Sequence, residues 1–388
     1  MRIACIHQGW ELYGSDRSFA ESVAALRGTH PDAEIEVVLP RPGPIVDILQ
    51  SHATRILFEP LWILRRKSLL RLATIDAPRL PIAVLRALRR LRSFDLVYVN
   101  TSVIVDYALA ARFSRDRTIL HIHEIPEGLA LKILGGLIRF SGSELIFNSN
   151  ATRQAFGDPK TVMTHVVYNG VEGPAAPLPV TYHGTRPLRV LLLGRINRIK
   201  GQDVLLDAVA ALPSSVRQRL EVRIVGSAFE SDEPERDLRE RIDRLGLGEH
   251  VTLLPFIPDP SQHYSWADVV TVPSKRPESL GRVAIEAMAW GRPVIASSIG
   301  GLTEVVDHGR TGWTLPPGDP SALRATLLAI LDDPAVLAPF AATGRLRYEK
   351  LFSRDAVSAT IGRIVTQKLA RRGIAAGLSS TTERGAAE

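Results

Sequence analysis

Cysteine is almost absent from this sequence of 388 residues, and its scarcity excludes one class of proteins. Cys5 is the one cysteine, so no intramolecular disulfide can form and a disulfide-stapled secreted domain is excluded. The apolar run from Ile3 to Ile6 around it indicates that Cys5 is a small buried hydrophobe.

Long apolar runs are missing as well. No stretch of 18 or more uncharged apolar residues occurs, which argues against a membrane-spanning helix. The apolar run that follows Met1 and Arg2 is too short for the hydrophobic part of a secretion signal. We therefore expect a cytoplasmic protein.

Aromatic residues make up only 6% of the chain, but its overall composition is that of a globular protein. Hydrophobic residues account for 45% and charged residues for 23%, a balance that excludes a mainly disordered chain. At about 100 to 200 residues per domain, the length predicts two domains. No nucleic-acid motif and no interleaving of basic with exposed aromatic residues occurs, so we expect no nucleic-acid partner.

Acidic residues are scarce in one segment, Leu61 to Arg92. The whole chain carries a net charge of +7, which indicates an anionic partner. In the segment, one acid stands against nine basic residues: Arg65, Arg66, Lys67, Arg71, Arg79, Arg86, Arg89, Arg90 and Arg92. Large apolar residues alternate with them, a pattern typical of amphipathic basic helices at an anionic membrane surface. Core-packed helices with solvated arginine faces would give the same pattern.

Short apolar runs alternate with helical stretches, which predicts an α/β fold built on parallel sheets. In the first half, strands are expected at Ile3–His7, Ile35–Leu39, Asp95–Asn100, Thr118–His123, Glu144–Asn148 and His165–Tyr168. In the second half, they are expected at Leu188–Leu193, Glu221–Val225, Val251–Leu254, Val269–Val272 and Val294–Ala296. Further helices are expected at Leu323–Leu331 and Ala356–Leu369.

A proline-rich stretch separates the two halves. Three prolines in the eight residues from Glu172 to Pro179 can sustain neither a helix nor a central strand. The expected organisation is a first domain at 1–171, a linker at 172–187, a second domain at 188–350, a helix at 351–372 that crosses back to the first domain, and a disordered tail at 373–388. Because parallel sheets bind ligands at the carboxyl ends of their strands, two facing sheets would place the active site in a cleft between the domains.

A glycine-bounded loop with three cations follows the expected strand Leu188–Leu193. It runs from Gly194 to Gly201 and includes Arg195 and Lys200. The planar fork of an arginine and the mobile charge of a lysine could together neutralise a diphosphate. The order of residues is not that of a Walker loop, and an ordinary surface loop remains an alternative.

A second loop follows the expected strand Val269–Val272 and enters a helix near Gly281. A glycine at a helix start lets an anion approach the free N–H groups there. Glu278 precedes the helix and Glu286 lies inside it. Eight residues of helix rise about 12 Å, which is too far for the paired carboxylates of a glycosidase, so the two glutamates are expected to have separate roles.

Two further groups follow strands of the first half. His121 and His123 share one face of a strand, but no third metal ligand is indicated nearby, so a metal site is not favoured. Histidines whose ring nitrogens are hydrogen-bonded within the protein are one alternative, and a His123 that hydrogen-bonds a substrate hydroxyl is the other. Gly14, Ser15 and Asp16 follow the first strand, where a glycine permits a ligand to approach the backbone. A turn with a helix cap is the alternative.

Taken together and in this order, these segments resemble the retaining GT-B glycosyltransferases of family 4, which use nucleotide-sugar donors. Glu278 and Glu286 match the E-x7-E pattern of that family, and Gly300 to Glu304 match a flanking motif. Arg195 with Lys200 matches its phosphate-binding pair. Tyr13 before Gly14, where a second glycine is usual, and Gly226-Ser227-Ala228, where a G-x-G turn is common, depart from the pattern.

The resemblance implies a GT-B fold of two Rossmann-like domains and a retaining sugar transfer to a saccharide or lipid-linked acceptor, in cell-surface polysaccharide or glycolipid synthesis. It implies that His123, Glu278, Arg195 and Lys200 are catalytic and that Gly14, Ser15 and Asp16 contact the acceptor or the diphosphate. The residues that it assigns to the donor are Arg195, Lys200, Glu278, Ser279, Leu280, Gly281, Arg282 and Glu286.

No D-x-D triplet occurs in the chain, so no metal and no other cofactor is expected. The basic, apolar-interleaved segment 61–92 leads us to expect contact with an anionic surface, at the inner face of the plasma membrane. Two alternatives remain: a nucleotide-sugar-binding or scaffold protein of GT-B architecture that does not turn over its ligand, and a nucleotide-sugar 2-epimerase of the same architecture.

Overall fold

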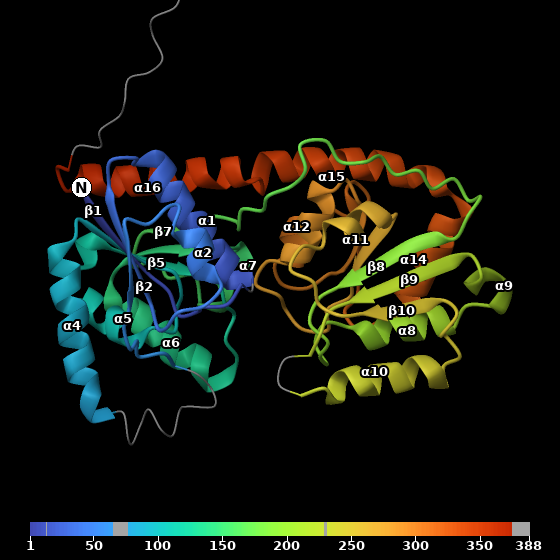
Figure 1. The fold of residues 1–388 in the computed structure, drawn as a ribbon, viewed down its shortest axis with the longest axis horizontal. Helices are drawn as coiled ribbons and strands as arrows, with labels where there is room; N and C mark the ends of the chain where they lie inside the picture. The colour runs from blue at the N-terminus through green and yellow to red at the C-terminus, as the bar shows by residue number, and fades with distance from the viewer. Residues whose placement is uncertain (13, 65–76, 229–230, 375–388) are drawn as a thin grey trace, which may run out of the picture. The chain divides into compact units, whose positions relative to one another are not determined.

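The computed structural model describes the chain except for residues 13, 65–76, 229–230 and 375–388 (Figure 1). The chain divides into two compact units. Unit 1 contains Met1–Asn148, Phe156–Val167 and the chain from Val357 onward, and unit 2 contains Ser149–Ala155 and Tyr168–Ala356. The proline-rich stretch expected as a linker thus counts with unit 2. The tail expected at 373–388 falls, from residue 375, outside the described residues.

Unit 1 is built on a seven-stranded sheet in which all paired strands are parallel, in the order β3-β2-β1-β4-β5-β6-β7. The strands are β1 (Arg2–Ile6), β2 (Glu34–Leu39), β3 (Arg55–Phe58), β4 (Leu96–Val99), β5 (Thr118–Ile122), β6 (Glu144–Phe147) and β7 (Thr164–Val166). The prediction of six strands was wrong by one. Strand β3 lies at the edge of the sheet and none of its residues is fully buried, so its sequence lacks the continuous apolar signal of an inner strand.

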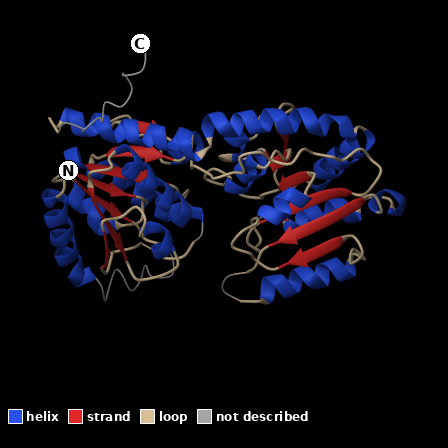
Figure 2. Ribbon diagram, turned by 45° about the horizontal axis from the view of Figure 1, so that its top comes forward, coloured by secondary structure: helices blue, strands red, loops and turns tan. Residues whose placement is uncertain are grey.

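Helices cover both faces of this sheet (Figure 2). One face packs on α1 (Gly14–Thr29), α2 (Ile45–Leu49) and the part of α16 (Arg354–Arg371) that counts with unit 1. The other face packs on α4 (Leu80–Ser93), α5 (Val105–Ala111) and α6 (Gly128–Ser141). Short 3₁₀ turns lie at Ala77–Arg79 and Arg115–Arg117. Cys5 points into the core and is fully buried, as its apolar run predicts, and burial raises the pKa of its thiol.

Unit 2 repeats this architecture on a six-stranded parallel sheet in the order β10-β9-β8-β11-β12-β13. The strands are β8 (Leu188–Leu193), β9 (Leu220–Val225), β10 (Val251–Leu254), β11 (Val269–Val272), β12 (Val294–Ser297) and β13 (Gly312–Leu315). Strand β13 was not predicted. It begins at a glycine, and three of its four residues are only partly buried, so its signal is again that of an edge strand.

The helices of unit 2 also form two layers. On one face lie α8 (Gln202–Ala210), α10 (Glu233–Arg244) and α14 (Pro320–Asp332). On the other face lie α11 (Ser261–Trp266), α12 (Arg282–Ala289), α13 (Leu302–Val305) and α15 (Leu337–Leu351). Two short helices, α7 (Asn150–Ala155) and α9 (Ser214–Arg217), and the 3₁₀ turn Pro334–Val336 complete the unit. The prediction of a two-domain α/β fold is therefore confirmed.

The basic segment from Leu61 to Arg92 packs partly into unit 1. Residues 65–76, which hold four of its nine basic residues, lie outside the described residues. Ile63 and Leu64 pack against the core cluster of α4, α5 and α6, so they do not stand out from the surface. Arg90 is also packed, since its guanidinium lies 2.6 Å from Glu59 and 3.0 Å from Glu36. These three residues therefore contribute to packing and ion pairs within unit 1, and contact of the segment with a membrane stays a prediction.

None of the described helices is, on its own, long and apolar enough to cross a membrane, although the bent pair Pro320–Asp332 and Pro334–Leu351 passes that test when taken together.

Candidate active site

The loop between β8 and α8 is shaped by two glycines and one asparagine. Gly226, at the end of β9, is packed so closely that a Cβ there would lie 1.9 Å from the carbonyl oxygen of Gly194. A Cβ on Gly201, which has a φ of +76°, would lie 2.0 Å from the carbonyl oxygen of Pro273. Asn197 turns the loop, because its Oδ1 accepts hydrogen bonds from the backbone N–H groups of Ile199 and Lys200 at 2.9 and 3.1 Å.

The loop that follows β11 meets this first loop. Lys275 donates its backbone N–H to the carbonyl of Ile199 at 2.7 Å. Lys200 places its ammonium nitrogen 2.8 Å from Oε1 of Glu278, and Ser274 donates its hydroxyl to the same oxygen. The side chains of Lys200 and Glu278 are 27% and 15% exposed. The structure therefore brings together two residues that the sequence placed in separate constellations.

Two glycines support the backbone around Glu278. A Cβ on Gly300, which has a φ of +59°, would lie 2.5 Å from the carbonyl oxygen of Glu278. The backbone N–H of Gly301 donates to that oxygen at 2.8 Å, and a Cβ on Gly301 would lie 2.4 Å from the carbonyl of Ser279. Only glycine permits this approach, so the glycine pair holds the loop that carries Glu278.

Helix α12 begins directly after this loop. Gly281, with a φ of +100°, stands at its N-cap position, and a Cβ there would lie 2.4 Å from Leu302. Inside the helix, Glu286 accepts a hydrogen bond from Nε of Arg282 at 2.7 Å and another from the Tyr264 hydroxyl at 2.7 Å. Among the described residues, no partner faces the buried Nη1 of Arg282. This end of unit 2 thus offers a helix N-terminus, a lysine and an incompletely bonded guanidinium.

The other residues expected at the donor lie in different surroundings. Leu280 is buried in the core cluster of α11, α12 and α15, so its side chain serves packing. Ser279 accepts a hydrogen bond from the Ser149 hydroxyl through its carbonyl. Arg195 is exposed, and its carbonyl accepts from Nε2 of Gln202 at 2.7 Å.

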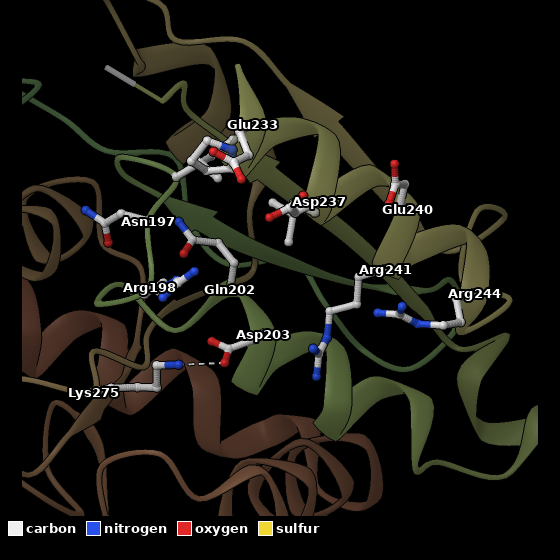
Figure 3. A pocket seen from close by; sticks show the side chains of 13 residues that line it. Asn197, Arg198, Gln202, Asp203, Glu233, Asp237, Glu240, Arg241, Arg244 and Lys275 are labelled. Atoms are coloured by element: carbon white, nitrogen blue, oxygen red, sulfur yellow. Dashed lines mark hydrogen bonds and ion pairs between the residues drawn. The ribbon is translucent and has the colours of Figure 1, made fainter. Parts of the chain in front are cut away.

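A pocket of about 570 Å³ opens on unit 2 beside the β8–α8 loop, between Asn197 and the start of α8 on one side and α10 on the other (Figure 3). Its lining is mixed in charge: Lys275 pairs with Asp203 at 2.6 Å, and Asp237 and Arg244 stand on α10. None of the expected donor residues lines it.

Unit 1 carries a separate polar cluster at the carboxyl ends of its strands. His123, directly after β5, lies with its Nε2 2.9 Å from Oδ1 of Asn100, which follows β4. Nδ2 of Asn100 lies 3.5 Å from Nδ1 of His7, and Nε2 of His7 lies 2.8 Å from Oδ1 of Asp16. All four residues are at most 7% exposed. The acid that follows His123, Glu124, accepts from Thr101 at 2.6 Å and from Gln8 at 3.1 Å.

The glycine-containing segment after β1 begins α1 at Gly14, with Ser15 in the first turn. The Asp16 side chain turns inward to His7. His121 lies beside His123, with ring centroids 3.9 Å apart. Burial lowers the pKa of His121, and a positive charge on His123, when that ring is protonated, would lower it further. No group of three or more metal-ligating side chains is present in the described part of the chain.

The sequence analysis assigns no role to four side chains of these sites: Ser274, Asn100, His7 and Tyr264. Ser274 follows β11, and Asn100 and His7 are the last residues of two expected strands, so their positions at strand ends are a usable signal. Tyr264 lies on α11, far from Glu286 in the chain, and no spacing rule would have found it.

Two parallel-sheet units, each with polar and charged side chains at the carboxyl ends of its strands, form the architecture of the GT-B glycosyltransferases. Residues 187–333 match the model of the family described as Glycosyl transferases group 1. HepE from Anabaena, solved in complex with UDP and glucose, is 25% identical to this chain, with a TM-score of 0.77 over 94% of this chain and 99% of that chain. The resemblance to GT-B glycosyltransferases is thereby confirmed.

Curated proteins named D-inositol 3-phosphate glycosyltransferase match part of the chain. The protein of Jonesia denitrificans is 36% identical over 213 residues, which cover 51% of this chain and 49% of that protein. The protein of Thermobispora bispora is 37% identical over 190 residues, which cover 47% and 44%. The matched part of the chain thus spans no more than about half the length of these relatives.

Proposed function

We propose that this protein is a retaining glycosyltransferase that moves a sugar from a nucleotide-sugar donor to an acceptor. The observation that supports this most is the contact between Lys200 and Glu278, 2.8 Å apart, beside the glycine-started helix α12. A lysine, a helix N-terminus and a carboxylate in one place fit a diphosphate that is linked to a hydroxyl-rich sugar.

The chemistry explains why these groups are needed. When the bond between the sugar and the nucleotide breaks, negative charge develops on the departing diphosphate. Lys200 and Arg195 would stabilise this charge, and the N–H groups at the start of α12 and Nη1 of Arg282 would add donors. Because these groups supply positive charge without a metal ion, we propose that the reaction needs none.

The two glutamates would have distinct tasks. Glu278, held by Lys200 and Ser274, would accept hydrogen bonds from sugar hydroxyls. Glu286, fixed between Arg282 and Tyr264, would accept from the hydroxyls of the donor ribose. In unit 1, His123 would contact the sugar or the reacting atoms. The cleft expected between the two domains stays a prediction.

The similar proteins suggest which substrates to test first. Because HepE was solved with UDP and glucose, a UDP-sugar is the first donor to test, and because the curated relatives are named for it, inositol 3-phosphate is one acceptor to test. A saccharide or lipid-linked acceptor at the inner face of the plasma membrane, in polysaccharide or glycolipid synthesis, is our preferred alternative. Exposed Ile82 and Leu85 on α4, 68% and 54% exposed beside arginines, would support contact with an anionic surface.

The test is nucleotide release from a panel of UDP, GDP and ADP sugars, with and without each acceptor. Release that depends on one donor and rises with one acceptor would support the proposal. Retention would be read from the anomeric configuration of the product by NMR. Donor binding without release or transfer, with every acceptor tried, would favour a binding protein and refute an enzyme.

A further inference from the structure

Four buried side chains form a chain of contacts that ends at His123. His7, Asn100 and His123 directly follow the neighbouring parallel strands β1, β4 and β5, so they lie at the same end of the sheet. Asp16 lies in the first turn of α1. The contacts run from Asp16 to His7 at 2.8 Å, from His7 to Asn100 at 3.5 Å and from Asn100 to His123 at 2.9 Å. His7 is also stacked on Phe19, with ring centroids 4.5 Å apart, which fixes the plane of its ring.

The chemistry of Asp16 sets the direction of every bond in this chain. An ionised carboxylate only accepts hydrogen bonds, so Nε2 of His7 must carry a proton. In a neutral imidazole the other nitrogen, Nδ1, is then an acceptor, and it faces the amide group of Asn100. Asn100 must therefore turn its NH₂ toward His7 and its Oδ1 toward His123.

We infer that Asp16, through His7 and Asn100, fixes the tautomer of His123. Because Oδ1 of Asn100 accepts, Nε2 of His123 carries the proton and Nδ1 is the acceptor nitrogen of the ring. Asp16, His7 and Asn100 are positioning residues in this arrangement. On the proposed function, on which this role rests, Nδ1 of His123 accepts the proton or hydrogen bond of a substrate hydroxyl.

Two neighbours of the His123 ring have hydrogen-bond partners of their own. Glu124 is held by Thr101 and Gln8, and Nδ1 of His121 lies 2.5 Å from the Tyr98 hydroxyl. His7 contacts both Asn100 and Asp16 and so links the two side chains.

The direct test is NMR of the full-length protein with ¹⁵N-labelled histidine, in which protonated and unprotonated ring nitrogens have separate chemical shifts. A His123→Gln variant identifies the His123 signals. We expect a protonated Nε2 and an unprotonated Nδ1 in the wild type. A proton on Nδ1, or averaged shifts of the two nitrogens, would overturn the inference.

A remote variant tests the role of Asp16. In Asp16→Asn the side chain keeps the shape of aspartate, but its amide can donate a hydrogen bond to His7. The direction of the hydrogen bonds from residue 16 to His123 can then reverse. We therefore expect a mixture of His123 tautomers, or the tautomer with the proton on Nδ1. An unchanged tautomer in folded Asp16→Asn protein would show that Asp16 does not set it. Thermal melting confirms that the variant is folded.

Kinetics test the consequence for turnover. Asn100→Leu keeps a similar side-chain volume and should lower kcat by about tenfold with little change in the KM for the donor, the scale for losing a group that orients a functional histidine. Asn100→Asp still offers an acceptor to His123 and should retain more activity than Asn100→Leu. Equal losses in both would argue for a purely structural role. Since the NMR result needs no turnover, an inactive protein with the expected tautomer would refute the proposed function and leave the tautomer assignment standing.

Discussion

Replacing Lys200 by alanine should lower turnover strongly and stability weakly. The ammonium group would supply one preorganised positive charge to the departing diphosphate, and losing one such donor costs about a hundredfold to a thousandfold in kcat. Because the charge on the diphosphate develops in the transition state, the loss should appear mainly in kcat and less in KM. Arg195→Ala should have an effect of similar size.

The stability of the Lys200→Ala variant follows from the local contacts. The ion pair with Glu278 joins side chains that are 27% and 15% exposed, so its loss should lower the free energy of unfolding by about 1 kcal/mol or less. Glu278 keeps the hydrogen bond from Ser274. The protein should therefore fold, and a small drop in Tm is the expected result.

Lys275→Ala is a matched control for this experiment. Lys275 lies in the adjacent loop and pairs with Asp203 at 2.6 Å, and its side chain is 32% exposed, similar to that of Lys200. It should lose a comparable amount of stability and keep turnover near the wild-type value. The assay is initial-rate nucleotide release at several donor concentrations with saturating acceptor. Unchanged kcat in Lys200→Ala, or an equal loss in Lys275→Ala, would refute the assignment.

Three further predictions concern the metal requirement, the C-terminal helix and the membrane. Turnover should persist in excess EDTA; full inhibition that added Mg²⁺ or Mn²⁺ reverses would reveal a metal site. Burial would raise the pKa of Glu144, but the hydrogen bonds and charges of His165, Lys368 and Arg371 outweigh it and lower this pKa to about 2. The contribution of the Glu144 carboxylate to stability is therefore complete at a pH above the ordinary pKa of a glutamate and is lost as the pH falls toward 2. In urea unfolding, Glu144→Gln should be less stable than the wild type by on the order of 2 kcal/mol at pH 7, and a gap that did not narrow at pH 3 would contradict this. The protein should cosediment with anionic vesicles at low salt and dissociate at high salt, whereas negligible binding to anionic and neutral vesicles alike would favour a soluble acceptor.

The inner strands could be predicted from the sequence, and the edge strands could not. The runs at β1 and β8 are buried on both faces and therefore almost wholly apolar. The missed strands, β3 and β13, have only four residues each and are mostly partly buried or exposed, so neither alternation nor a continuous apolar run marks them.

In the candidate site, likewise, some residues could be predicted from the sequence and others could not. Lys200 and Glu278 were predicted because each follows a strong strand, and parallel strands end on one edge. The hydrogen bond from Tyr264 to Glu286 depends on how α11 and α12 pack, and a sequence pattern carries no information on that packing. The reach of Asp16 to His7 likewise depends on the packing of α1 against the sheet, and the sequence suggested only a cap or a ligand contact for Asp16.

The short helix α7 has a consequence for any attempt to exchange or isolate the units. Residues Ser149–Ala155 count with unit 2, although the chain on both sides of them counts with unit 1. Glu304 accepts the backbone N–H groups of Asn150 and Ala151 at 2.9 and 2.7 Å, and Ser149 donates to Ser279 next to Glu278. A chimera joined near Tyr168 would therefore bring a foreign α7 to the loop that carries Glu278, and a fragment that began there would leave the Glu304 carboxylate without these donors. Swaps of donor specificity between relatives should consequently transplant two separate pieces of sequence, Ser149–Ala155 together with Tyr168–Ala356.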